Sequence, residues 1–159
     1  MTPPVSIEPT IDRDYAAWLP LWLGYQRFYG VEIAEEVSRI TWRRFHDGGE
    51  PMFAALARSG TEAVGFVHFV LHRSCWSEGD YCYLQDLFVA EGARNGGVGR
   101  RLIEHVYARA AAEHCARVYW LTQANNALAM RLYDRIADRP GFVQYRKAPP
   151  FLPENDDVW

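Results

Sequence analysis

Apolar and polar positions along the chain change their period near residue 50, which separates a helical part from a strand-rich part. Before it, apolar residues recur every three or four positions over Tyr15–Tyr29 and Glu32–Phe45, a spacing typical of amphipathic helices. Pro20 lies inside the first pattern and leaves open a kink or a late helix start. After residue 50, shorter apolar runs bounded by turn residues predict strands over Met52–Ala57 and Ala63–His72, and Ser6–Glu8 is a short candidate strand before the helices.

The second half of the chain alternates strands and helices. Tyr81–Val89 is apolar and aromatic on both faces, which predicts a central strand covered on both sides. A glycine-rich segment follows, and then apolar residues at steps of four from Val98 predict a helix. The remaining predicted elements are a strand over Arg117–Thr122, a helix over Asn126–Ala137 and a strand over Phe142–Tyr145. This order predicts one mixed α/β (α+β) domain over residues 1–159, in which the proline-rich, acidic tail 148–159 is irregular.

Composition narrows the class of protein. The 159 residues are 49% hydrophobic and 23% charged, which is the composition of one globular domain. The net charge of −3 excludes a strongly basic nucleic-acid binder, so no nucleic-acid partner is expected. The charge is uneven: the stretch from Asp86 to Lys147 carries +4 and the remainder −7. The positive part suits an anionic ligand and the negative part a cationic one.

The ends and the cysteines argue for a cytoplasmic protein. The N-terminal residues lack a basic segment followed by an apolar one, so no secretory signal is expected, and no apolar run is long enough to span a membrane. The three cysteines show no C-x-x-C spacing, and the five histidines are scattered. We therefore expect neither disulfides nor a metal site.

The glycine-rich segment 94–99 lies between the strongest strand and a helix, where backbone N–H groups can approach a phosphate. It is not a P-loop, since Arg100 follows Gly99 where Lys is required, and it is not a dinucleotide fingerprint, since Leu102 replaces the third glycine. Taken alone, the segment is either a phosphate cradle or a plain turn.

Two motifs in order give the chain a family resemblance. Arg94-x-x-Gly97-x-Gly99 matches the Arg/Gln-x-x-Gly-x-Gly/Ala motif of the GNAT superfamily of acetyl-CoA-dependent N-acetyltransferases. A second signature resembles that family downstream, in Asn126-x-x-Ala129-x-x-Leu132-Tyr133 followed by Gly141-Phe142. The resemblance covers about residues 54–147 and is strongest to the spermidine/spermine N-acetyltransferase-like and yeast Hpa-like branch. It implies a mostly antiparallel central sheet with helices on both faces.

The resemblance also implies a binding site for acetyl-CoA as co-substrate, with no metal. The backbone of Leu87, Phe88 and Val89 is expected to pair with pantetheine, and one of its N–H groups to polarise the acetyl carbonyl. Arg135 is either a CoA contact or a solvated helix charge. The expected cofactor residues elsewhere are Arg94, Asn95, Gly96, Gly97, Val98, Gly99, Arg100, Asn126, Ala129 and Arg135.

Three residues are candidates for proton transfer. Tyr133 occupies the family's tyrosine position and is expected to protonate the leaving thiolate, and the alternative is a half-buried helix tyrosine that packs in the core. Gln85 stands where related polyamine enzymes carry Glu, so a water chain, Asp86 or another carboxylate is expected to be the base. Alternatively, Gln85 only orients the amine or a water. Asp86 is alternatively a structural carboxylate, and in a regular strand it points away from the face of Gln85 unless a bulge intervenes.

Substrate contacts and partners follow from the same resemblance. Phe28, Tyr29 and Trp76 are expected to line the amine site, unless they are core aromatics. The acceptor is expected to be a primary amine on a small molecule: a polyamine, an amino acid or a related cation. The alternatives are a protein or histone-tail lysine acetyltransferase and a non-catalytic acyl-CoA sensor. The family also leads us to expect a homodimer.

Overall fold

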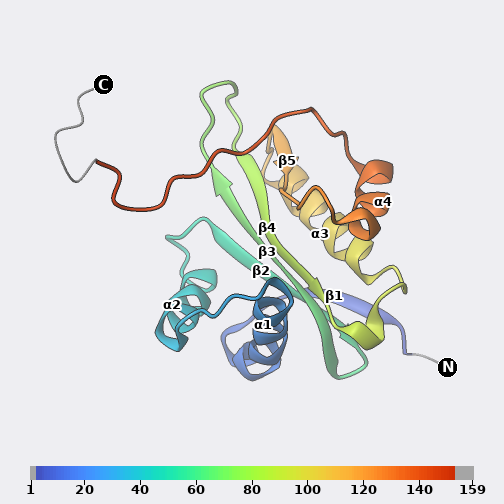
Figure 1. Cartoon of the computed structure of the whole chain (residues 1–159). Coiled ribbons are helices and arrows are strands. Elements are labelled where there is room, and N and C mark those ends of the chain that lie inside the picture. The colour runs from blue at the N-terminus through green and yellow to red at the C-terminus, as the bar shows by residue number, and fades with distance from the viewer. Residues whose placement is uncertain (1–2, 153–159) are drawn as a thin grey trace. The chain divides into compact units, whose positions relative to one another are not determined.

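The structure is a computed structural model that describes residues 3–152. The chain divides into two compact units, Met1–Leu121 and Thr122–Trp159, which are described separately. Figure 1 labels the elements of both units.

The first unit is built on a mixed sheet, whose described strands follow one another in the order β1-β2-β3-β4-β5. Neighbouring strands are antiparallel, except that β4 and β5 run parallel. Two short 3-10 helices, Asp12–Asp14 and Glu91–Ala93, follow β1 and β4. The strands are β1 (Val5–Pro9), β2 (Met52–Ser59), β3 (Glu62–His72), β4 (Tyr81–Val89) and β5 (Arg117–Tyr119).

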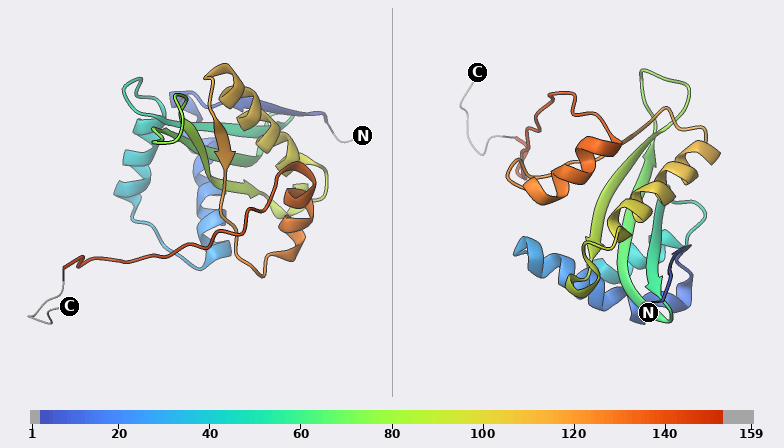
Figure 2. Two further views of the ribbon diagram at one scale, coloured as in Figure 1. Left: turned by 90° about the horizontal axis from the view of Figure 1, so that it is seen from above. Right: turned by 90° about the vertical axis from the view of Figure 1, so that its right-hand side faces the viewer.

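Helices cover both faces of this sheet (Figures 1 and 2). Helices α1 (Tyr15–Tyr29) and α2 (Glu35–Phe45) pack on one face, and α3 (Val98–Ala112) packs on the other. The core under α1 and α2 is aromatic, and the rings of Trp18 and Trp42 lie 4.9 Å apart at its centre. Burial of such large rings is the main source of stability in a core of this size. The predicted class, a mixed α/β fold with a mostly antiparallel sheet between helices, is confirmed.

The two N-terminal helices differ from the prediction in one boundary. Helix α1 spans the predicted residues and passes through Pro20 without a break. Helix α2 begins at Glu35, three residues later than predicted. The reason is a contact with the preceding helix: the side-chain Oε1 of Gln26 accepts a hydrogen bond from the backbone N–H of Ile33 and holds that segment outside α2.

Two predicted strands near the C-terminus are wrong in whole or in part. The strand predicted over Arg117–Thr122 ends at Tyr119, where its pairing with β4 ends. The segment Phe142–Tyr145 forms no strand in the described structure, and 85% of Phe142 and 93% of Tyr145 are exposed. Its apolar alternation suits a strand, but a strand also needs a hydrogen-bonding neighbour, and no described strand pairs with it.

The second unit contains helix α4 (Ala127–Ile136), and its described residues beyond the helix are irregular. Residues 148–152 of the predicted tail have neither helix nor strand, and residues 153–159 lie outside the described part of the chain. None of the described helices combines the length and apolar character needed to cross a membrane.

Candidate functional site

The backbone of β4 contains a bulge at Gln85. Phe69 of β3 pairs with Leu84, but the preceding His68 pairs with Asp86, so Gln85 is the additional residue. An additional residue reverses which face the following side chains occupy. Asp86 therefore points to the face covered by α1, instead of sharing the face of Leu84 as a regular strand requires. The bulge that would redirect Asp86 is thus present, and Gln85 itself is exposed.

The carboxylate of Asp86 is held by two donors from two different elements. The hydroxyl of Tyr25 donates to Oδ1 over 2.7 Å, and Nδ1 of His68 lies 2.9 Å from Oδ2. The side chain of Asp86 is 12% exposed and that of His68 is 4% exposed. A buried carboxylate with both oxygens paired is fixed in position while retaining free lone pairs.

The negative charge of Asp86 acts on two tyrosines of α1. Burial raises the pKa of Tyr25, and the charge and hydrogen bond of Asp86 raise it further. The pKa of Tyr29 is also raised, first by burial and then by the same charge. The rings of Tyr25 and Tyr29 lie 4.8 Å apart. Both phenols therefore stay protonated at neutral pH.

One edge of β4 is open beyond the bulge. Strand β5 pairs with β4 only from Tyr81 to Tyr83. No other described strand takes this edge from Leu84 to Val89, the stretch that contains the predicted backbone contacts Leu87, Phe88 and Val89. Backbone N–H and C=O groups that face away from a sheet partner are available to pair with an extended ligand.

The open edge leads into the predicted glycine-rich turn. Asn95 and Gly97 have positive φ values of 66° and 76°, which turn the chain sharply into α3. The first helical hydrogen bond is donated by Arg101 to the carbonyl of Gly97. The N–H groups of Val98, Gly99 and Arg100 precede it and lack an intrahelical acceptor. Together with the positive end of the helix dipole, they form a surface suited to phosphate. Gly96 lies within the same turn.

Arg94 links this turn to two predicted site residues. Its Nε donates to the carbonyl of Val89 over 3.0 Å. Its guanidinium lies 5.6 Å from the ring centre of Phe28 and 5.8 Å from that of Phe88. The structure therefore brings the predicted cofactor residues Arg94 and Phe88 together with the predicted substrate residue Phe28, which is 59% exposed.

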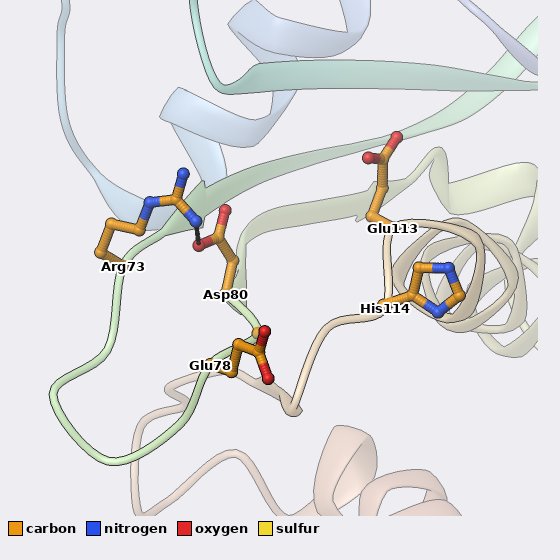
Figure 3. A pocket seen from close by; sticks show the side chains of 6 residues that line it. Arg73, Glu78, Asp80, Glu113 and His114 are labelled. Carbon is orange, nitrogen blue, oxygen red and sulfur yellow. Dashed lines mark hydrogen bonds and ion pairs between the residues drawn. The ribbon is translucent and has the colours of Figure 1, made fainter.

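Trp76 does not lie with the cluster of Arg94, Phe88 and Phe28. It lies in the turn between β3 and β4, is 82% exposed, and makes no ring contact with Phe28 or Tyr29 within residues 3–152. A surface cavity of about 490 Å³ lies at this end of the sheet, where Arg73 and Asp80 form an ion pair (Figure 3). It reaches His114, just beyond the C-terminal end of α3, whereas the glycine-rich turn is at the other end of that 15-residue helix, about 22 Å away at 1.5 Å per residue. This charged cavity is therefore separate from the predicted site.

The remaining predicted residues belong to the second unit. Asn126 is the N-cap residue of α4, and its side-chain amide donates to the hydroxyl of Thr122 over 3.2 Å. Ala129, Tyr133 and Arg135 lie on the helix itself, and the carbonyl of Tyr133 accepts a hydrogen bond from the N–H of Ala137. Among the described residues, no group of His, Cys, Asp or Glu side chains is arranged to hold a metal ion.

Sequence reasoning missed the groups that hold Asp86. The indole N–H of Trp18 donates to Nε2 of His68 over 2.9 Å, so Trp18, His68, Asp86 and Tyr25 form one continuous hydrogen-bonded chain. The spacing of Trp18 and Tyr25 is that of ordinary helix residues that face the core. His68 occupies the position of an ordinary core residue in a strand. No sequence signal marks them, because the pairing of His68 with Asp86 depends on the bulge.

Comparisons with known proteins show which proteins this chain is similar to. The acetyltransferase (GNAT) family matches residues 16–137. The chain is 38% identical over 144 residues to the D-amino-acid N-acetyltransferase HPA3 of Saccharomyces cerevisiae, with 89% of this chain and 88% of that protein covered. A crystal structure of a probable acetyltransferase is 25% identical and superposes with a TM-score of 0.77 over 95% of this chain and 99% of that chain. An aminoglycoside N-acetyltransferase in complex with CoA is 13% identical, with a TM-score of 0.79 over 92% of this chain and 95% of that one, a likeness in fold alone.

Proposed function

Because this chain belongs to the acetyltransferase (GNAT) family and is an acetyltransferase, we propose that it transfers an acetyl group from acetyl-CoA to the primary amine of a small molecule. The amine attacks directly while both substrates are bound. The acceptor is an amino acid, a polyamine or a related cation, and the similarity to the yeast D-amino-acid N-acetyltransferase supports the amino acid. The observation that carries the proposal is the bulge that turns Asp86 toward α1 beside an open strand edge that leads into the glycine-rich turn.

The open edge and the turn fit the two ends of acetyl-CoA. The edge of Leu87–Val89 that faces away from β3 offers hydrogen bonds to the amide-containing pantetheine arm, and one of its N–H groups polarises the acetyl carbonyl. The free N–H groups at the start of α3 and the guanidinium of Arg94 offer positive charge to the diphosphate. The other proposed cofactor residues are Asn126, at the N-cap of α4, and Ala129 and Arg135 on that helix. Bound acetyl-CoA supplies the activated thioester.

The reaction needs two proton transfers. An amine of pKa about 10.4 is protonated at pH 7, and deprotonating it costs about 4.6 kcal/mol, so the site needs a proton acceptor. Asp86 is the only carboxylate among the proposed residues, and Gln85, exposed at the bulge, orients the amine. Tyr133 then protonates the departing thiolate, which a neutral phenol can do.

The acceptor amine binds against aromatic side chains. Phe28 and Tyr29 stand at the C-terminal end of α1 with ring centres 5.1 Å apart, and both are exposed. Ring faces attract cations, which suits an ammonium group before it loses its proton. Trp76 is the third proposed contact and the one with least support, since it lies on a separate turn.

The test is release of CoA thiol from acetyl-CoA over a panel of acceptors: D- and L-amino acids, polyamines and lysine-containing peptides. We expect turnover with a small primary amine. Turnover with peptides alone would instead identify a protein acetyltransferase, and binding of acetyl-CoA without turnover would identify a sensor.

A pair of arginine variants tests the cofactor site. Arg94→Ala removes a charged hydrogen-bond donor worth about 1.5–3 kcal/mol, so we expect the KM for acetyl-CoA to rise about tenfold or more. Arg73→Ala removes an exposed arginine at the other end of the sheet and is expected to leave this KM within about twofold. Equal effects of the two substitutions would contradict the proposed position of the diphosphate.

We also propose that the enzyme is a homodimer. Phe142, Val143 and Tyr145 are exposed apolar residues with no strand partner in the described structure, which supports a contact with a second copy. Light scattering of the purified chain is expected to give twice the mass of 18.3 kDa. A monomer mass at micromolar concentration would contradict the dimer and leave the acetyl-transfer proposal intact.

A further inference from the structure

The hydrogen-bonded chain of Trp18, His68, Asp86 and Tyr25 joins α1, β3 and β4 beneath the proposed site. We propose that this chain, the Asp86 relay, takes the proton that the acceptor amine loses, with Tyr25 passing it to Asp86 and His68 positioning Asp86. The inference rests on the proposed acetyl transfer and identifies the proton acceptor where Gln85 replaces a glutamate.

The direction of each hydrogen bond follows from the chemistry of the groups. An indole N–H can only donate, so Nε2 of His68 must be an acceptor toward Trp18. The single proton of neutral His68 is then on Nδ1, from which it is donated to Asp86. Tyr25 donates to the other oxygen of Asp86. All donors in the chain therefore point toward Asp86, which makes it the place where a proton is received.

The surroundings keep this direction fixed. His68 is enclosed by aromatic rings, with that of Phe66 at 4.4 Å and that of Phe45, from α2, at 4.6 Å. These rings offer it no alternative partner, so rotation of His68 would leave a buried nitrogen unpaired. The titratable groups that interact with Asp86 from α1 are the phenols of Tyr25 and Tyr29, and Tyr83 of β4 interacts with Tyr25. No Lys or Arg is among the hydrogen-bond partners of the relay in the described structure.

Tyr25 lies between the two proposed substrate positions. The centre of its ring lies 4.8 Å from that of Tyr29, which is proposed to bind the amine. It lies 6.4 Å from that of Phe88, on the open edge of β4 that is proposed to bind acetyl-CoA. Its raised pKa keeps the hydroxyl protonated, so it can pass a proton on only while it receives another. An N–H bond of the ammonium breaks and a new O–H bond forms on Tyr25. The original hydroxyl proton of Tyr25 moves to Oδ1 of Asp86, and the amine lone pair becomes free to attack.

Tyr25→Phe removes the hydroxyl and keeps the ring packing. General acid–base groups contribute about 10²- to 10⁴-fold, so we expect kcat at pH 7 to fall about 100-fold. As the pH is raised, the wild-type kcat should reach a plateau at a pH below the pKa of the amine. The variant kcat should instead keep rising about tenfold per pH unit until the pH reaches that pKa. A weaker base than the free amino acid, such as its amide with an amine pKa of about 7.7–8.0, should recover most of the loss.

Tyr15→Phe is the matched control. It also removes a buried phenol hydroxyl from α1, but the hydroxyl of Tyr15 has no hydrogen-bond partner in the described structure. We expect the kcat and its pH profile to be those of the wild type. Thermal melting and acetyl-CoA titration of both variants check that neither the fold nor cofactor binding accounts for the difference.

Two variants test the rest of the relay. Asp86→Asn should give the same steep pH profile as Tyr25→Phe. His68→Leu, which deletes the donor to Asp86, should lower kcat, and His68→Gln, which retains a donor, should recover part of it. If wild-type enzyme turns over an amine and Tyr25→Phe and Asp86→Asn keep its pH profile, the relay is overturned and acetyl transfer stands. If no amine or peptide is acetylated by the wild type, both are overturned.

Discussion

Strands β3 and β4 approach each other so closely at Gly65 that no side chain fits there. A Cβ atom at this position would lie 2.8 Å from the backbone oxygen of Phe88 and 3.4 Å from Cδ1 of Leu102. Carbon and oxygen atoms normally approach to about 3.3–3.6 Å. In Gly65→Ala, the two strands would therefore have to move apart by about 0.5 Å or more at this point. The obstacle is backbone in a paired strand, which cannot rotate away as a side chain can.

The expected cost of Gly65→Ala is a difference between two effects. Forcing an additional methyl group into a packed region lowers the free energy of unfolding by about 1–3 kcal/mol. Replacing glycine also restricts the unfolded chain, which raises the free energy of unfolding by about 0.4–1 kcal/mol. We expect a net loss of about 1–2 kcal/mol in the free energy of unfolding. For a chain of this size, the melting temperature should fall by about 2–8 °C. Because the oxygen belongs to Phe88, we also expect the KM for acetyl-CoA to rise.

Thermal unfolding followed by circular dichroism measures this change, with Gly48→Ala as the control. Gly48 lies in a turn where an added Cβ meets nothing within 4 Å, so the same substitution is expected to raise the free energy of unfolding by about 0.4–1 kcal/mol. The two variants share the effect on the unfolded chain, and their difference isolates the contact with β4. Equal stability of the two variants would refute the claim that β3 and β4 approach too closely at Gly65 for a Cβ atom to fit.

Three further outcomes are expected. Tyr133→Phe should lower kcat about 100-fold with unchanged acetyl-CoA binding in a calorimetric titration, and an unchanged kcat would remove Tyr133 from the mechanism. Gln85→Glu should leave the pH profile of kcat unchanged if the Asp86 relay already accepts the proton, and a large gain in kcat would show that the wild-type site lacks a base. Burial, and secondarily Cys115, raises the pKa of the Cys82 thiol to about 12, so little reactive thiolate forms at pH 8. An alkylating reagent should therefore modify the exposed Cys75 first and reach Cys82 only on unfolding, as peptide mass spectrometry would record.

Local pattern was sufficient to predict most elements of the first unit. Helix α1 and strand β4 have the predicted bounds, because each buries its apolar side chains within one uninterrupted segment. The prediction was wrong where a side chain of the preceding helix intervenes, as with Gln26 at the start of α2. It was also wrong for Phe142–Tyr145, since an alternating pattern specifies a strand only when another strand is there to pair with it.

For the site, the sequence by itself determined the family and the glycine-rich turn, since both depend on residue types at fixed spacing along the chain. Only the tertiary structure decided the direction of Asp86, because one additional residue at Gln85 reverses the faces of the strand and sequence alternation predicts the opposite. The same holds for Trp18, Tyr25 and His68, which read as core residues in the sequence. Their hydrogen bonds span 18 to 61 positions and exist only once the sheet and α1 have packed.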